Sequence, residues 1–429
     1  MLCVTLWYCT TPQHYNIYTS VNKTVPTKTW LRIALLNFLV AAIMGATMRF
    51  AFVEELRWMD YRFMMHGHSH VAMLGWIYMA LYALLIHYFL PKEKQENVFY
   101  KRLFWLTEAT VIGMAVAFPI QGYAGFSIAF SSLHIIFSYL FMWRFLRDTQ
   151  TSQKGKYSFR FVQLALWFMV LSTLAIWCMP VLMKMNMRGS AVYYAAVQFY
   201  LHFQFNGWVI FSILGLFFKM TEFHQLPILE KNANRFIYLL IVSCLLTYVL
   251  AVTWSTPLPI LFWINSAGVA FQLAALIYFA FIFKRMQPFL DGHFSGWVRN
   301  LFLIALISFF VKIIIQTAVI VPQIGVVAYT IRNFVLGFIH LLLLGMATCF
   351  LLGFAAHENL ISLAVKGAKA GLAILMTGII LSEFILFGQG VLLWGEMGFL
   401  PAYYNLIFGV SVLMPVGLVV FAYSQFTST

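Results

Sequence analysis

Charged side chains are scarce in this sequence. Asp, Glu, Lys and Arg make up only 9% of the 429 residues, whereas hydrophobic residues make up 62%. A soluble protein of this size needs more polar surface than that, because its exterior must be hydrated. The composition therefore excludes soluble, disordered and collagen-like proteins, and it predicts an all-α polytopic membrane protein embedded in a lipid bilayer.

Cysteines and acidic residues are also few. The five cysteines show no pattern, and three of them (Cys178, Cys244 and Cys349) lie inside apolar runs, so they indicate packing thiols rather than disulfides. Asp and Glu number 13 against 27 Lys and Arg, which gives a net charge of +14. Because the basic residues are scattered over short loops, we expect no nucleic-acid partner.

Long apolar runs fill most of the chain. About 20 apolar residues form a helix that crosses a ~30 Å hydrocarbon core. The sequence predicts twelve such spans, at residues 33–52, 69–90, 103–121, 127–146, 161–181, 195–218, 236–253, 258–283, 300–321, 332–355, 370–390 and 402–424. Only short polar links separate them, so residues 31–429 are expected to form one transmembrane domain. Residues 1–30 show no cleavable signal pattern and predict a cytoplasmic tail.

Basic residues predict the orientation. Twenty of the 27 lie in the N-terminal tail or in the links after the even-numbered spans, six lie in the opposite links, and Lys312 lies within a span. Basic loops remain in the cytoplasm, so both termini are expected to be cytoplasmic. The short links and this topology indicate the inner (cytoplasmic) membrane.

One short pattern occurs three times along the chain. It consists of a histidine, four residues, a glycine and a large side chain, at His70-Gly75-Trp76, His202-Gly207-Trp208 and His340-Gly345-Met346. The histidines are 132 and 138 residues apart, and each separation covers four expected helices. The twelve helices therefore form three pseudo-repeated groups of four, and the second helix of each group carries one histidine.

Histidines within a membrane usually face a cavity, a partner or a cofactor, because an unused imidazole is costly in hydrocarbon. Glycines flank two of these histidines about one turn away on both sides, at Gly67, Gly75, Gly337 and Gly345. They would leave room for a flat ligand such as a porphyrin, although glycine also lets membrane helices approach each other. Three histidines at matching positions favour cofactor or metal binding over packing alone.

With these repeats, and with the phrases HGHSHVAMLGW and GFIHLLLLGM, the sequence resembles subunit I of the haem-copper oxidase superfamily, closest to its cbb-type cytochrome oxidase and nitric-oxide reductase branches. The resemblance implies a low-spin haem b held by one histidine on the second helix and one on the tenth, which match His70 and His340. Two histidine ligands leave no open iron position, so electron transfer is expected. Other respiratory-chain subunits and a cytochrome c or quinol donor are the partners that the resemblance implies.

The sequence departs from this family at the oxygen-reducing site. Phe338 stands where oxygen-reducing members carry a second histidine on the tenth helix, and no histidine lies between His224 and His293 to serve the seventh helix. His202 matches the sixth-helix position and is a candidate ligand for copper or another metal. The chain therefore resembles a member that lacks the binuclear centre. If it is an enzyme, it would be an oxidoreductase of the cytochrome c oxidase or nitric-oxide reductase type.

Two alternatives remain open at this point. One is the NnrS-type group of twelve-helix haem and copper membrane proteins linked to nitric-oxide stress. The other is a haem-free zinc or copper transporter or assembly factor, in which His66 and His70 share a helix face and bind the metal. His68 points roughly the opposite way, and we expect it to be hydrated at the membrane surface.

Three charged residues are expected within the membrane: Glu108, Lys312 and Glu383. Such groups suggest an ion pair, a proton path or a ligand contact. The interpretation that we favour is a structural ion pair between Lys312 and an acid on the third or eleventh helix, with a proton- or quinol-related role as the alternative.

Overall fold

A computed structural model describes residues 26–226, 228–294 and 296–427. The described chain contains helices and no strand, and twelve of its helices are long and apolar enough to cross a membrane. The prediction of an all-α, twelve-span membrane protein is therefore confirmed. Most of the predicted N-terminal tail, residues 1–25, lies outside the described residues, and residues 26–30 already belong to the first helix.

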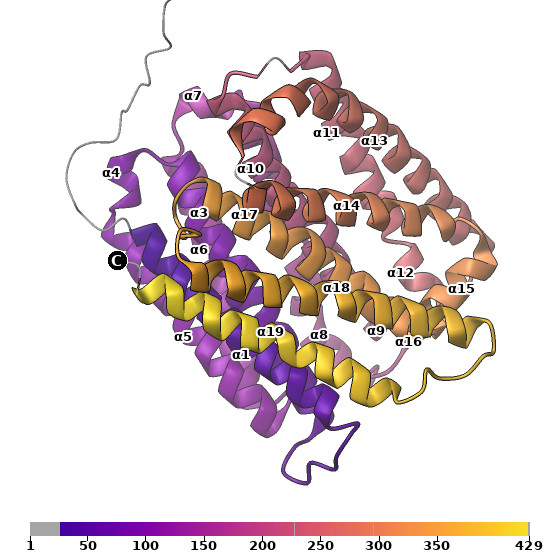
Figure 1. Cartoon of the computed structure of the whole chain (residues 1–429). Helices are drawn as coiled ribbons and strands as arrows, with labels where there is room; N and C mark the ends of the chain where they lie inside the picture. Colours follow the sequence, from indigo (N-terminus) through magenta and orange to yellow (C-terminus); the bar gives the residue numbers. More distant parts are fainter. Residues whose placement is uncertain (1–25, 227, 295, 428–429) are drawn as a thin grey trace, which may run out of the picture.

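The twelve spans follow one another with short links (Figure 1). In chain order they are α1 (Pro26–Phe50), α2–η1–α3 (Tyr61–His70, Val71–Tyr78, Met79–Phe89), α5 (Val98–Gln121), α6 (Gly125–Asp148), α8 (Tyr157–Lys184), α9–η2–α10 (Ala191–His202, Phe203–Val209, Ile210–Phe223), α11 (Glu230–Thr247) with α12 (Leu250–Thr253), α13 (Pro259–His293), α14 (Gly296–Ala318), α16–η3–α17 (Arg332–His340, Leu341–Thr348, Cys349–His357), α18 (Lys366–Trp394) and α19 (Tyr403–Thr427). The links carry the short helices α4 (Lys92–Gln95), α7 (Thr151–Lys154) and α15 (Pro322–Thr330).

The second span begins earlier than the sequence predicts. Asp60 caps α2, because its carboxylate accepts a hydrogen bond of 2.9 Å from the backbone N–H of Phe63. The helix therefore starts at Tyr61 instead of residue 69. As a consequence, His66 and His68 stand inside the helix and within the bundle, half-buried, instead of at its end.

The three sequence repeats share one backbone conformation. Each repeat histidine ends an α-helix, and a π-helical segment of seven or eight residues starts at the next residue. Such wide turns are rare in proteins and are often found at functional sites. Three of them at equivalent positions support the division into three groups of four helices.

In each group of four helices, the first helix packs against the glycine of the π-segment. A Cβ atom at Gly75, Gly207 or Gly345 would lie 2.5–3.0 Å from a side chain of that helix, which is Asn37, Phe168 or Ser308 respectively. Thirteen residues after the histidine a second small residue follows in each repeat: Ala83, Gly215 and Gly353. The two small residues per repeat let the first and second helices of each group pack closely.

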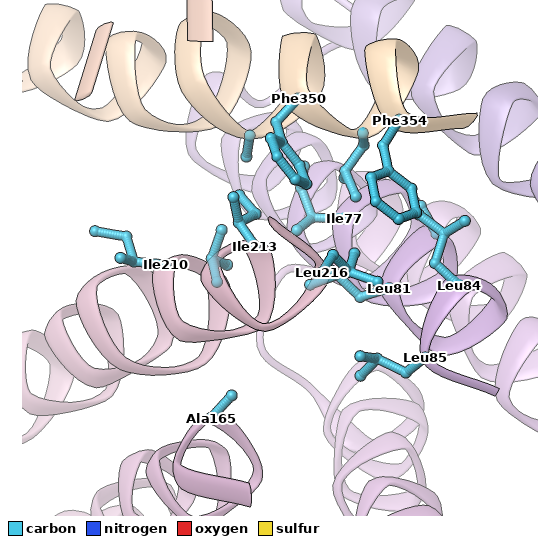
Figure 2. Close-up of a cluster of buried hydrophobic side chains, with 14 of the residues drawn as sticks. Ile77, Leu81, Leu84, Leu85, Ala165, Ile210, Ile213, Leu216, Phe350 and Phe354 are labelled. Atoms are coloured by element: carbon cyan, nitrogen blue, oxygen red, sulfur yellow. The ribbon is translucent and has the colours of Figure 1, made fainter. Parts of the chain in front are cut away.

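The three second spans meet at the centre of the bundle. The indole Nε1 of Trp76 donates a hydrogen bond of 2.8 Å to Thr348 Oγ1, and the Tyr78 and Trp208 rings lie 5.8 Å apart. Toward the other end of these spans, Figure 2 shows aliphatic side chains of α3 and α10 and the Phe350 and Phe354 rings of α17 gathered in one buried cluster. This half of the centre is a packed apolar core.

The nine other spans surround the central three in chain order. The ring closes because α19 packs along α1, so that Arg32 near the start of α1 lies 5.4 Å from the ring of Phe426 near the end of α19 (Figure 1). Both ends of the described chain therefore lie on the same side of the bundle, as an even number of spans requires.

Candidate functional site

The central spans divide the bundle into three sectors, each bounded by two central spans and the outer helices between them. The first sector runs from α2–η1–α3 through α5, α6 and α8 to α9–η2–α10. The second sector continues through α11, α13 and α14 to α16–η3–α17. The third sector runs through α18, α19 and α1 back to α2–η1–α3. Each sector contains buried polar side chains in the half of the bundle that holds the repeat histidines.

His68 lies in the third sector, beside α1. Its Nδ1 lies 2.8 Å from the backbone oxygen of Ala41, so Nδ1 carries the proton and donates it to that carbonyl. Nε2 is then left with its lone pair, and it makes no hydrogen bond within the described part of the chain. A Cβ atom at Gly45 would lie 3.0 Å from Cε1 of the ring, so the missing side chain at Gly45 makes space for the imidazole.

His340 occupies the same sector, opposite α18. Its Nδ1 lies 3.9 Å from Glu383 Oε1, and this nitrogen and both Glu383 oxygens are buried without a hydrogen-bond partner among the described residues. Both His68 and Arg49 lie within electrostatic range of the His340 ring, and Arg49 also lies within range of Glu383. The third sector thus brings together two imidazoles, one carboxyl group and one guanidinium group from four spans.

His70 lies on the other side of the second span, in the first sector. Its Nδ1 lies 2.8 Å from the backbone oxygen of His66, and its ring lies 4.2 Å from the ring of Phe118 on α5. The His66 ring contacts Tyr123, whose pKa burial raises to about 12. His70 and His66 therefore share a face, as the sequence predicts, but that face looks toward α5.

His134 of α6 completes the polar groups of the first sector. Its ring lies 4.7 Å from the ring of Tyr78 and within electrostatic range of His70, and its Nε2 is buried without a partner among the described residues. The structure thus groups His70 with His66 and His134, and it groups His68 with His340. The pair matched by resemblance, His70 and His340, lies in two different sectors.

His202 lies in the second sector, and the protein engages both of its ring nitrogens. Nε2 lies 2.8 Å from the Cys244 backbone oxygen, and Nδ1 lies 3.4 Å from Asn206 Nδ2. A carbonyl only accepts, so Nε2 donates and Nδ1 accepts a long hydrogen bond. A metal ion at His202 would have to displace one of these contacts.

The glycines beside the histidines contact protein side chains. A Cβ atom at Gly67 would lie 3.0 Å from Pro119, one at Gly75 2.7 Å from Val111, one at Gly337 3.0 Å from Phe387, and one at Gly345 2.5 Å from Ser308. These distances favour close helix packing, the second of the two roles considered for them. Trp76 and Trp208 are buried in the core, at 3% and 1% exposure.

The ion pair expected for Lys312 is not found in the described chain. Glu108 on α5 accepts a hydrogen bond of 2.9 Å from Asn37, which also donates to the Gly75 carbonyl in η1. Glu383 on α18 lies beside His340 instead. The three intramembrane charges therefore have different neighbours: Glu108 meets Asn37 of α1, Glu383 meets His340 of α16, and Lys312 lies in the second sector.

No group of three or more His, Cys, Asp or Glu side chains able to hold a metal ion occurs in the described ranges. Sequence reasoning did not identify His68, which it placed at the hydrated membrane surface, nor Arg49 beside it. A signal for His68 was present in the small residues Ala41 and Gly45 of the first span, which leave one face of that helix open. Searches with the chain find no matching family model and no matching curated protein.

Proposed function

We propose that this multi-pass membrane protein binds haem b in its third sector and transfers electrons, with His340 and His68 as the residues that would hold the haem. The proposal extends the resemblance to haem-copper oxidase subunit I, and it replaces His70 with His68 on geometric grounds. The observation that carries it is the shared sector: two histidines from different central spans lie within electrostatic range of each other and leave nitrogens open. We expect the inner membrane as its location and respiratory-chain proteins as its partners.

The residues of the third sector fit such a group. A histidine that binds a metal through Nε2 donates its Nδ1 proton to a carbonyl or a carboxylate, which fixes the ring. His68 already has this arrangement, with the Ala41 carbonyl as acceptor. His340 has a carboxyl acceptor 3.9 Å away in Glu383, and both groups are buried without another partner in the described chain. A ring bound on its Nε2 side would make this hydrogen bond favourable.

Bound haem would supply reversible one-electron chemistry. The side chains of the third sector would orient the haem and shield it from water. The Ala41 carbonyl holds His68 in the required tautomer, and Glu383 would accept the Nδ1 proton of His340. Arg49 lies within electrostatic range of the Glu383 carboxyl group. Two histidine ligands would favour electron transfer over the reduction of a gas.

The other two functions considered above receive less support. A zinc site needs about four ligands around one ion, and the described residues provide no cluster of three. His66 and His70 share a face, but the Nδ1 of His70 donates to the His66 carbonyl, and aromatic rings border both imidazoles. No observation favours a nitric-oxide-stress role over general electron transfer.

A reduced-minus-oxidised spectrum of the detergent-purified protein, with a pyridine haemochrome assay, tests the proposal. We expect a low-spin haem b signal that His68→Ala abolishes and His70→Ala leaves in place. His87→Ala serves as a control, because His87 lies near the opposite end of the span and bonds to Thr27. Haem-free protein from cells well supplied with haem would refute the proposal. Loss of haem in His70→Ala but not in His68→Ala would restore the ligand pair of the resemblance.

A further inference from the structure

Lys312 of α14 is a buried cation, and the described part of the chain places no acidic partner beside it. Its exposure is 2%, and no carboxylate of the described residues lies within ion-pair distance of it. Glu108 bonds to Asn37 of α1, and Glu383 lies beside His340. A charge removed from water in this way is strongly destabilising unless a counter-charge or several dipoles compensate for it.

The nearest groups to Lys312 are neutral. It lies within electrostatic range of the His202 ring and of the Cys244 thiol. Both His202 nitrogens already contact Cys244 and Asn206, and the Cys244 backbone oxygen accepts from the imidazole. These groups leave the positive charge of Lys312 without compensation.

Further polar groups with open hydrogen-bonding capacity are buried in the same sector. Six side-chain atoms have no partner among the described residues: Asn206 Oδ1, Ser243 Oγ, Asn265 Nδ2 and Oδ1, Gln272 Oε1, and Gln316 Oε1. They come from η2, α11, α13 and α14, which are four of the elements that enclose the second sector. Buried polar groups are normally satisfied, so this concentration indicates a site for a polar ligand.

The amides of α13 face the bundle and not the lipid. Asn265 and Gln272 are 1% and 4% exposed, whereas Trp263 on the opposite face is 73% exposed. Gly268 lies between the two amides, and a Cβ atom there would meet Leu246 and Thr247 of α11. The Asn265 Nδ2 group is thus an open amide donor within the second sector, Gln272 carries a further amide on the same face of α13, and Gln316 stands one helical turn from Lys312 on α14.

We infer that the second sector binds one small monovalent anion, of the size of chloride or formate, with Lys312 as its charge partner and buried amides as additional donors. One positive charge matches one negative charge, and a divalent anion would leave an excess. The site is independent of haem, because it lies in a different sector and uses none of the proposed haem ligands.

Equilibrium binding of radiolabelled chloride to the detergent-purified full-length protein tests this inference. We expect saturable binding of about one chloride per chain, with competition by formate and none by gluconate at constant ionic strength. Thermal unfolding in chloride should occur a few degrees above that in gluconate, because a ligand that binds only the folded state stabilises it.

Two substitutions locate the site. Lys312→Met should abolish chloride binding and the chloride-dependent shift in Tm. Lys219→Met removes the same charge near the far end of α10, where Lys219 bonds to Gln153, and should change neither. If Lys312→Met does not fold, Gln316→Leu keeps the charge and should weaken binding about tenfold, as expected for one lost hydrogen bond to a charged group. Absence of saturable binding in the parent, or unchanged binding in Lys312→Met or Gln316→Leu, would overturn the inference.

Discussion

His202 and His340 hold the same position in the repeat but meet different neighbours. Each ends an α-helix, precedes a π-segment and stands five residues before a glycine that packs on the group's first helix. The protein engages both nitrogens of His202. Nδ1 of His340 has no hydrogen-bond partner in the described chain, and the nearest acceptor lies 3.9 Å away.

The repeat therefore fixes where each histidine stands on its helix. The outer helices determine which groups contact its ring. The α11 carbonyl of Cys244 closes the site at His202, whereas α18 places a carboxyl group at His340. An open imidazole in a membrane protein has a free-energy cost that a bound cofactor can offset. On this argument, we propose the third sector as the site of a metal-centred group.

The largest expected effect is on haem content, and it should differ between removal of the His340 imidazole and removal of the His202 imidazole. We expect His340→Ala to lose the haem signal completely, since His340 is one of the two histidines proposed to hold the haem. His202→Ala should retain the haem content of the parent, because it lies in another sector. Haem absorbance per polypeptide after purification measures both. Equal loss in the two variants would mean that the sectors are not separate.

The carboxyl group beside His340 should have the next largest effect. Glu383→Gln removes the negative acceptor for the imidazole N–H, and the loss of such a partner typically weakens metal binding 10–100-fold. A less basic imidazole also stabilises the oxidised iron less, so the midpoint potential should rise. Haem retention on dilution and a redox titration measure the two effects. Glu108→Gln is the matched control, because Glu108 is a buried acid that bonds to Asn37 between α5 and α1, away from His340.

The packing glycines should contribute to stability irrespective of the histidines. Gly207→Ala would place a Cβ atom 2.5 Å from the Phe168 Cβ atom, and overpacking of this kind costs about 1–3 kcal/mol of unfolding free energy. At Gly409 in α19 a Cβ atom meets nothing within 4 Å, so Gly409→Ala should change stability by less than about 1 kcal/mol. Thermal unfolding in detergent compares the two variants, and a Gly207→Ala protein as stable as Gly409→Ala would argue against close packing at the π-segment.

The sequence was sufficient to predict the membrane spans, but not which neighbours each face of a span contacts. Twelve apolar runs predict twelve helices because hydrocarbon requires every backbone hydrogen bond to be satisfied within the span. The histidine repeat also predicts the threefold division, since its spacing equals four spans. The start of the second span was predicted eight residues too late, because Asp60 caps a helical turn that contains polar residues and carries little hydropathy signal.

The neighbours of each histidine could not be predicted in the same way. On a helix, His68 and His70 point in nearly opposite directions, which the sequence does reveal. Whether α1 or α5 lies on a given side depends on how distant spans pack, and no local pattern records it. The missing ion pair of Lys312 has the same origin, because Glu108 meets Asn37 of α1 and Glu383 meets His340 of α16 instead.

The smallest effect that we predict is on the unfolding free energy, and its sign differs between substitutions of His202 and His340. In haem-free protein, His202→Leu leaves the Cys244 carbonyl unpaired, and it should lower the unfolding free energy by about 0.6–2 kcal/mol. His340→Leu removes an imidazole whose Nδ1 has no hydrogen bond within the described chain, so stability should stay unchanged or rise slightly. Thermal unfolding of both proteins, purified from haem-deficient cells, gives the comparison. A larger loss in His340→Leu than in His202→Leu would mean that the protein itself satisfies His340, and the argument for an open site in the third sector would fail.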